Sequence, residues 1–385
     1  MGTCLELDDL PVVDNHCHGI DRDQVPADLA DWRSRFTESP HPRARAVDAA
    51  DTAFYRRLMR RLAGFHGLDP DADEQVVLAA RGRTGTQQLT TALLTDARVA
   101  GLVVDTGYPA ADQVVPPDVL EHATGTPPAR LMRLELLFQE LVAAHPTLAA
   151  VTQALRHQLG DVRASGHAGF KSIAGYRTGL AVRRWGPDEL DAAFRSAREE
   201  VGRAGSVRLG HKPLLDTLLH AALQVAAEQE LPVQFHVGYG DPDVDLRTAS
   251  PLALREVLED EAYRGVPIVL LHGCWPYVRE GAFLAAVYQN AYLDLSYGIP
   301  FLSLGEMTAM TAAALGTAPF SKLMYSSDGA RVPELHWMGA HDGRRVLGRV
   351  LGGLVDDGEL SAAQATDAAT RILAGTATAM YGVGS

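Results

Sequence analysis

Short apolar runs rich in β-branched residues alternate with helical stretches along most of the chain. The eight runs cover residues 11–18, 101–105, 129–135, 169–173, 231–236, 266–272, 291–296 and 322–328. Between them apolar residues recur at helical spacing, most clearly over residues 187–229 and over a final stretch from about 344 to 381. This alternation is typical of a parallel sheet whose strands are joined by crossover helices.

Residues 22–97 interrupt the alternation, because this segment has helical spacing throughout and few β-branched runs. We predict a helical insertion after the first strand of a single (β/α)8 barrel domain, an α/β fold, spanning residues 1–385. An open doubly wound sheet is the alternative fold. It would place a glycine-rich phosphate loop after the first strand, whereas this strand ends in His16-Cys17-His18.

The composition of the chain limits the classes of partner that it is expected to bind. A net charge of −13 argues against a nucleic-acid surface and a polybasic membrane patch. The three cysteines have no CxxC spacing, no apolar leader begins the chain, and no apolar run is long enough to span a membrane. We expect a cytoplasmic protein that acts on a small molecule, and the sequence leaves homo-oligomerisation open.

Polar residues of ligand type stand at the carboxyl ends of six predicted strands. They are His16, His18, Glu135, Lys171, His236, His272 and Asp328. In a barrel the carboxyl ends of the strands open on one face, which is the usual place of the active site. One such residue would mean little, but this set predicts a metal centre.

Residues two apart on a strand point the same way, so His16 and His18 should face together, with Asp14 one step deeper and Cys17 turned away. Two neutral imidazoles suit zinc, iron, manganese or nickel. We expect His236 as a third ligand. We expect Asp328 both to bind the metal and to take a proton from a coordinated water.

Other roles stay open. His272 is either a ligand of a second metal or a proton shuttle. Lys171 is a carbamylated bridge between metals, a cationic contact for a substrate anion, or the ion-pair partner of Glu135. Glu135 is accordingly a ligand, a bridge or that partner, and Arg177 is a candidate second anion contact. Tyr239 and Trp275 are candidate pocket walls. The remaining histidines, His336 among them, are expected on helices or at the surface.

Five segments together resemble the amidohydrolase-related family, and within it the FluG-like branch, between Val12 and Asp328. They are Val-Asp-Asn-His-Cys-His-Gly, Phe-Lys-Ser-Ile-Ala-Gly-Tyr-Arg-Thr-Gly-Leu, Gln-Phe-His-Val-Gly-Tyr-Gly-Asp, Leu-His-Gly-Cys-Trp-Pro-Tyr and Ser-Ser-Asp-Gly. The resemblance implies a barrel with one or two divalent metals (zinc, iron or manganese) among His16, His18, His236 and Asp328, with His272 as ligand or acid/base. It implies attack of a metal-bound hydroxide on a carbonyl carbon.

Three reactions are consistent with such a barrel. The leading prediction is hydrolysis of an amide or ester bond in a small acidic metabolite. The alternative is suggested by a similarity to the nonheme diiron monooxygenase of platensimycin and platencin biosynthesis. It would hydroxylate a CoA-linked terpenoid intermediate of secondary metabolism, with Glu135 and His272 completing a second metal site. Decarboxylation, known among the relatives, is the third.

Overall fold

The computed structural model describes residues 3–384. Its strands are β1 Val12–His18, β2 Val99–Asp105, β3 Ala129–Arg133, β4 His167–Ser172, β5 Val233–Phe235, β6 Ile268–Leu270, β7 Ala291–Ser296 and β8 Leu323–Ser326. They belong to one eight-stranded sheet in the order β1 to β8, and the pairs β1–β2 and β3 to β7 are parallel. The fold is a (β/α)8 barrel, which confirms the fold class expected from the sequence.

Each predicted strand is present, but the carboxyl ends differ from the prediction. β3 ends at Arg133, so Glu135 lies in the first turn of the next helix and not on a strand. β5 and β6 are three residues long, and His236 and His272 follow them in the outgoing loops. Asp328 likewise lies two residues after β8. Apolar runs overestimate strand length here because buried loop residues are as apolar as strand residues.

The chain divides into two compact units. Unit 1 holds the residues up to Ala129, Leu295–Gly316 and the residues from Leu323 on, and unit 2 holds Arg130–Asp294 and Thr317–Lys322. Unit 1 contains β1, β2 and β8. Unit 2 contains β4 to β6 and most of β3 and β7.

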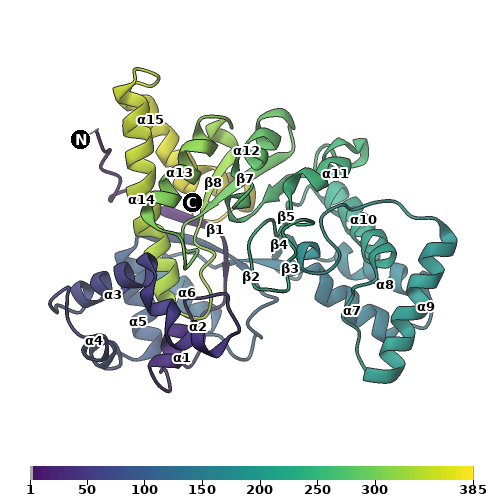
Figure 1. The fold of residues 1–385 in the computed structure, drawn as a ribbon. Helices are drawn as coiled ribbons and strands as arrows, with labels where there is room; N and C mark the ends of the chain where they lie inside the picture. Colours follow the sequence, from purple (N-terminus) through teal and green to yellow (C-terminus); the bar gives the residue numbers. More distant parts are fainter. Residues whose placement is uncertain (1–2, 385) are drawn as a thin grey trace. The chain divides into compact units, whose positions relative to one another are not determined.

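The segment predicted as a helical insertion is helical. Its helices are α1 Leu29–Ser34, α2 Pro42–Ala46, η1 Asp48–Asp51, α3 Ala53–Phe65, α4 Glu74–Arg81 and α5 Thr86–Asp96, drawn in purple to blue in Figure 1. Asp28, Thr52 and Asp73 cap α1, α3 and α4 by accepting a hydrogen bond from a backbone N–H of the first turn. That this segment is an insertion within a single barrel domain stays a prediction.

The remaining helices mostly follow the strands. In unit 1 they are α6 Pro117–Thr124, α13 Leu304–Leu315, α14 Pro333–Asp356, α15 Ala362–Thr370, η7 Arg371–Gly375 and α16 Thr376–Tyr381. In unit 2 they are α7 Leu134–Ala144, α8 Leu148–Gly160, η2 Ala174–Tyr176, α9 Pro187–Ala204, α10 Lys212–Gln229, η3 Pro251–Leu254, α11 Arg255–Glu259, η4 Glu261–Tyr263, η5 His272–Cys274, α12 Val278–Val287 and η6 Phe320–Lys322. Among residues 3–384, no helix combines the length and the apolarity needed to cross a bilayer.

A buried ion pair fastens α4 to α14 within unit 1. The Arg81 guanidinium donates to both carboxylate oxygens of Glu334, and their side chains are 3% and 0% exposed. Arg81 also lies over the ring of Trp32, 4.7 Å from its centroid. Because both charges are out of water, each depends on the other for compensation.

Arg81→Ala should therefore lower the free energy of unfolding by about 3–5 kcal/mol, because it leaves the Glu334 carboxylate buried without a counter-charge. Urea unfolding followed by circular dichroism measures the loss. Arg255→Ala, which breaks the exposed pair with Glu259, is the matched control and should change stability little. A loss no larger than that of the control would show that Glu334 is not held as a buried charge by Arg81.

Candidate metal centre

In unit 1, the two histidines at the end of β1 converge on one carboxylate. Nε2 of His16 and Nε2 of His18 lie 3.4 and 3.5 Å from Oδ1 of Asp328. The imidazole rings are 5.0 Å apart and nearly perpendicular. The structure therefore brings together the three predicted ligands that come from the first and last strands.

Asp105 joins this group, and the sequence analysis missed it. It ends β2, is buried, and its Oδ2 lies 3.9 Å from Nδ1 of His18. Donor atoms of His16, His18 and Asp105 all lie within 4.8 Å of one another. The sequence did contain evidence for Asp105, because it is a polar residue at the carboxyl end of an apolar strand. The other ligands were selected by that same criterion.

The loop after β8 is hydrogen-bonded along β1. The Asp328 N–H donates to the His16 carbonyl at 3.0 Å, and the His18 N–H donates to the Gly329 carbonyl at 2.8 Å. Asp328 has φ 52°, in the left-handed region that a non-glycine residue adopts at a cost. This backbone conformation turns the Asp328 carboxylate toward the two histidines.

Asp14 does not share the face of His16 and His18, contrary to the prediction from strict alternation. The pairing of β1 with β2 is irregular between Asp14 and Cys17, which breaks the two-residue period. The Asp14 carboxylate accepts hydrogen bonds from the N–H and hydroxyl of Ser327. Asp14 therefore anchors the loop after β8 and is not placed as a ligand beside the histidines.

Beside Asp14 lie the buried side chains of Cys17 and His336. Nδ1 of His336 is 3.7 Å from Oδ2 of Asp14, and the ring is 1% exposed. The prediction of a helical position for His336 is right, because it lies on α14, but it is not at the surface. Burial, with Asp14 the first of the contributing carboxylates, raises the pKa of the Cys17 thiol well above its usual value. Cys17 is thus held as a neutral thiol.

In unit 2, His236 and His272 form a hydrogen-bonded pair. Nε2 of His272 and Nδ1 of His236 are 2.9 Å apart, and Nε2 of His236 is 2.6 Å from the Tyr239 carbonyl. A carbonyl only accepts, so the Nε2 of a neutral His236 carries the proton and its Nδ1 keeps a lone pair. His272 then donates its Nε2–H to that lone pair.

The backbone after β6 is unusual over three residues. His272, Gly273 and Cys274 all have positive φ, at 65°, 57° and 52°. The Gly273 N–H donates to the buried carboxylate of Asp294 on β7, at 3.2 Å. Successive left-handed residues are costly and collect at functional sites. Here they aim the His272 ring at His236.

Glu135 is completely buried at the start of α7. Its Oε1 accepts from the Ser172 hydroxyl at 2.7 Å, and its Oε2 is buried without a hydrogen-bond partner in the described chain. Burial raises the pKa of Glu135 above its ordinary value. Among residues 3–384, Glu135 forms no ion pair with Lys171, so the predicted salt bridge between them is absent.

Two cationic residues of unit 2 were predicted to hold an anion. Lys171 lies on β4 and is 1% exposed. Arg177 follows η2 and is half-buried, and its Nε has no hydrogen-bond partner within the described residues. Burial, followed by the nearby Arg208, lowers the pKa of Arg177. Arg177 therefore has hydrogen-bonding capacity left for an anion.

The predicted wall residues Tyr239 and Trp275 connect the loops after β5 and β6. The Tyr239 N–H donates to the Trp275 carbonyl at 2.9 Å. The Tyr239 ring packs edge-on against His272, with centroids 5.2 Å apart. A third aromatic residue, Tyr176, was missed, although its ring lies 4.4 Å from that of His236. Tyr239 and Tyr176 thus contact the histidine pair in unit 2.

The residues present fit a divalent metal. In unit 1, Nδ1 of His18 is buried and has no hydrogen-bond partner in the described range, and imidazole and carboxylate donors stand together. In unit 2, His236 has the arrangement typical of a ligand, with one ring nitrogen donating to a carbonyl and the other holding a lone pair. Metal identity and number do not follow from these donors.

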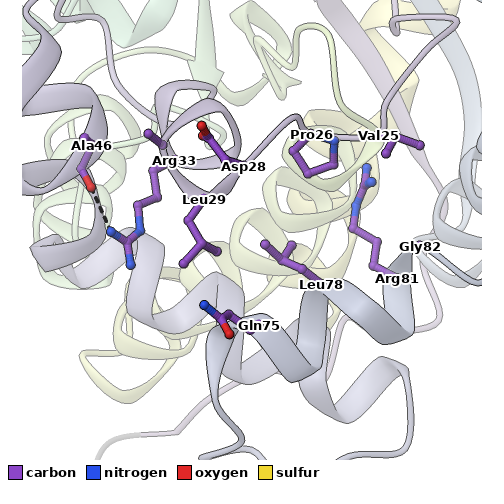
Figure 2. A pocket seen from close by; sticks show the side chains of 11 residues that line it. Val25, Pro26, Asp28, Leu29, Arg33, Ala46, Gln75, Leu78, Arg81 and Gly82 are labelled. Atoms are coloured by element: carbon purple, nitrogen blue, oxygen red, sulfur yellow. Dashed lines mark hydrogen bonds between the residues drawn. The ribbon is translucent and has the colours of Figure 1, made fainter.

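A cavity of about 700 Å³ lies elsewhere in unit 1, among the helices that follow β1 (Figure 2). Its wall residues include Val25, Pro26, Leu29 and Leu78, and no predicted metal ligand. Figure 2 shows Arg33 hydrogen-bonded to the Ala46 carbonyl. Because the metal ligands do not line this cavity, its volume does not measure the substrate.

The fold and these donors define a class of barrel enzymes that use metals. A solved structure from Lactobacillus casei, whose assignment as a metal-dependent hydrolase is provisional, matches 99% of this chain and 98% of its own with a TM-score of 0.86 and 28% identity. A uronate isomerase from Thermotoga maritima matches 97% and 95% of the two chains with a TM-score of 0.70 at 14% identity. The second likeness shows the fold alone.

The family model of the amidohydrolases matches residues 160–383, more than half of the chain. The chain belongs to the amidohydrolase family. Protein fluG of Emericella nidulans is 33% identical over 220 residues, which are 55% of this chain and 25% of fluG. The match thus spans about a quarter of that relative's length. The resemblance to the FluG-like branch is confirmed.

The double substitution His16→Ala/His18→Ala should remove stoichiometric metal, because it takes away both imidazole donors of β1. Elemental analysis of the purified protein measures metal per chain. His41→Ala/His122→Ala, two exposed histidines of the same unit, is the matched control and should keep the metal. Full metal content in the His16/His18 variant would rule out this centre.

Glu135 makes the stability of the metal-free protein depend on pH. Its folded-state pKa is raised, so the folded chain binds one more proton than the unfolded chain above the ordinary glutamate pKa of about 4.3. The difference in free energy of unfolding between the parent chain and Glu135→Gln should then decrease as the pH rises. The decrease should reach at most about 1.4 kcal/mol per pH unit, and it should stop once the pH exceeds the pKa of Glu135 in the folded chain. Urea titrations from about pH 4 upward test this. Glu140→Gln, exposed on the same helix, controls for the loss of a carboxylate. A difference independent of pH would contradict the assignment.

Proposed function

We propose that the chain is a metal-dependent hydrolase that cleaves an amide or ester bond in a small acidic metabolite. The observation that carries the proposal is the convergence of His16 and His18 on the Asp328 carboxylate in a member of the amidohydrolase family. The wider family supports metal dependence but leaves the reaction and the substrate to experiment.

Each unit is proposed to supply metal ligands from the carboxyl ends of its strands, the usual place of the active site in a (β/α)8 barrel. In unit 2, His236 and His272 follow β5 and β6. We assign His16, His18, His236 and Asp328 as metal ligands. His272, Glu135 and Lys171 are the candidates for a second metal, which leaves the count at one or two.

The bound metal would supply Lewis acidity and lower the pKa of a water toward neutrality. The residues of the chain would carry the protons. The Asp328 carboxylate is the proton acceptor at the metal site, and its fixed backbone holds it at the histidine nitrogens. His272 is the second proton carrier, because it already hydrogen-bonds to His236.

Arg177 and Lys171 are assigned to the acidic group of the substrate. Arg177 has a buried guanidinium nitrogen without a partner in the described chain, and a carboxylate would satisfy it. Tyr239 and Trp275 are proposed to bound the pocket beside these cations. Their loops are joined by a backbone hydrogen bond, which makes that wall rigid.

The first test is elemental analysis of the purified chain, followed by a panel of amides and esters with and without a carboxylate. One or two equivalents of zinc or manganese, and hydrolysis that stops on chelation and returns with metal, are expected. About two equivalents of iron with oxygen consumption on CoA-linked substrates, and no hydrolysis, would overturn the proposal in favour of a diiron oxygenase.

Arg177→Gln should raise KM for a carboxylate-bearing substrate by about 10- to 100-fold, the worth of one charge-assisted hydrogen bond. KM for the matched neutral substrate should stay unchanged, as should metal content. Arg247→Gln, which removes an exposed arginine ion-paired with Asp245 in the same unit, is the control. Equal losses on charged and neutral substrates would show that Arg177 acts only on structure.

A further inference from the structure

A second cavity of unit 1, of about 500 Å³, is lined mainly by arginines. Its lining residues are Ala53, Arg56, Arg57, Arg60, Arg61, Pro70 and Arg345. We propose that this arginine pocket binds a compact anion carrying two or more phosphate or carboxylate groups. No predicted metal ligand and no residue assigned to the substrate lines the pocket, so the site is additional to the proposed hydrolase centre.

Helix α3 carries its arginines on one side and buries its apolar residues on another. Its apolar residues Phe54, Leu58 and Leu62 recur every four positions and are buried. The arginines occupy positions 56, 57, 60 and 61, so two pairs of like charges stand four residues apart. Such pairs repel by about 0.2–0.5 kcal/mol each. A helix without acidic residues has no internal means to relieve this repulsion.

Neighbouring carboxylates neutralise three of the five arginines. Arg56 pairs with Asp51, and Arg60 pairs with Asp71, both at exposed positions. Arg57 donates through Nε and Nη2 to the buried carboxylate of Asp342, at 3.0 and 2.8 Å. Arg57 is therefore fixed in place, and it forms a rigid part of the pocket wall.

The other two arginines, Arg61 and Arg345, form no ion pair with any carboxylate of the described chain. Arg61 is half-buried, and burial lowers its pKa; the nearby Asp342 carboxylate opposes this shift, and the like charges of Arg345 and Arg57 add to it. A guanidinium withdrawn from water beside other guanidiniums is stabilised by an anion that reaches several of them. Bidentate guanidinium contacts suit phosphate and carboxylate oxygens equally.

The size and surroundings of the pocket favour a small ligand. A volume of about 500 Å³ is in the range of sites for small molecules. The chain as a whole carries a net charge of −13, which disfavours a long polyanion that would extend beyond the pocket. A compact di- or triphosphate, or a tricarboxylate, fits both limits.

Calorimetric titration of the metal-free full chain with tripolyphosphate, pyrophosphate and citrate tests the proposal. One saturable site per chain is expected, with affinity that falls as salt rises. Preference for the phosphates or for citrate identifies the ligand source, and either supports the site. The His16→Ala/His18→Ala variant should bind equally well, which separates this pocket from the metal centre and leaves the proposed hydrolase function untouched by the result.

Arg61→Gln/Arg345→Gln should weaken binding at least tenfold while circular dichroism and metal content stay those of the parent chain. Arg247→Gln/Arg255→Gln removes two exposed, ion-paired arginines of unit 2 and is the matched control for charge. Absence of saturable binding, or equal weakening by both double variants, would overturn the proposal.

Discussion

The attachment of the loop after β8 to β1 is the constraint on which the candidate metal site of unit 1 depends. Backbone hydrogen bonds run from Asp328 to the His16 carbonyl and from His18 to Gly329, and Asp14 holds Ser327 through its N–H and hydroxyl. These contacts hold Asp328 in a left-handed backbone conformation, which is energetically unfavourable for a residue other than glycine. The carboxylate is thereby presented to both imidazoles before any ion arrives. Preorganisation of this kind spares the metal the entropy of ordering its own ligands.

In unit 2, the histidine pair is organised by a different constraint, which is the choice of tautomer. The Tyr239 carbonyl dictates which nitrogen of His236 carries the proton, and His272 then occupies the remaining lone pair with its own N–H. A metal at Nδ1 of His236 would compete with this hydrogen bond, and His272 would have to turn away or carry its proton on the other ring nitrogen.

Sequence reasoning succeeded where periodicity is uninterrupted and failed where the backbone departs from it. The eight strands and the fold class followed from the alternation of apolar β-branched runs with helical stretches, and the shared orientation of His16 and His18 followed from the two-residue period of a strand. Asp14 was assigned to the wrong face because a register irregularity in β1 is invisible in a residue pattern. Glu135 was placed on a strand because an apolar helix start reads like a strand end. His336 gave no local signal, since its place beside Asp14 comes from packing of α14 more than 300 residues away.

The contact between Asp14 and Ser327 joins residues 313 positions apart. During synthesis at about 5–20 residues per second, roughly 15–60 s pass between the emergence of one partner and that of the other. Throughout this interval the nascent chain carries both β1 histidines without the carboxylate that completes their set. The site of unit 1 can therefore form only after β8 and Asp328 have been synthesised, and an ion that needs both histidines and this carboxylate binds no earlier than that.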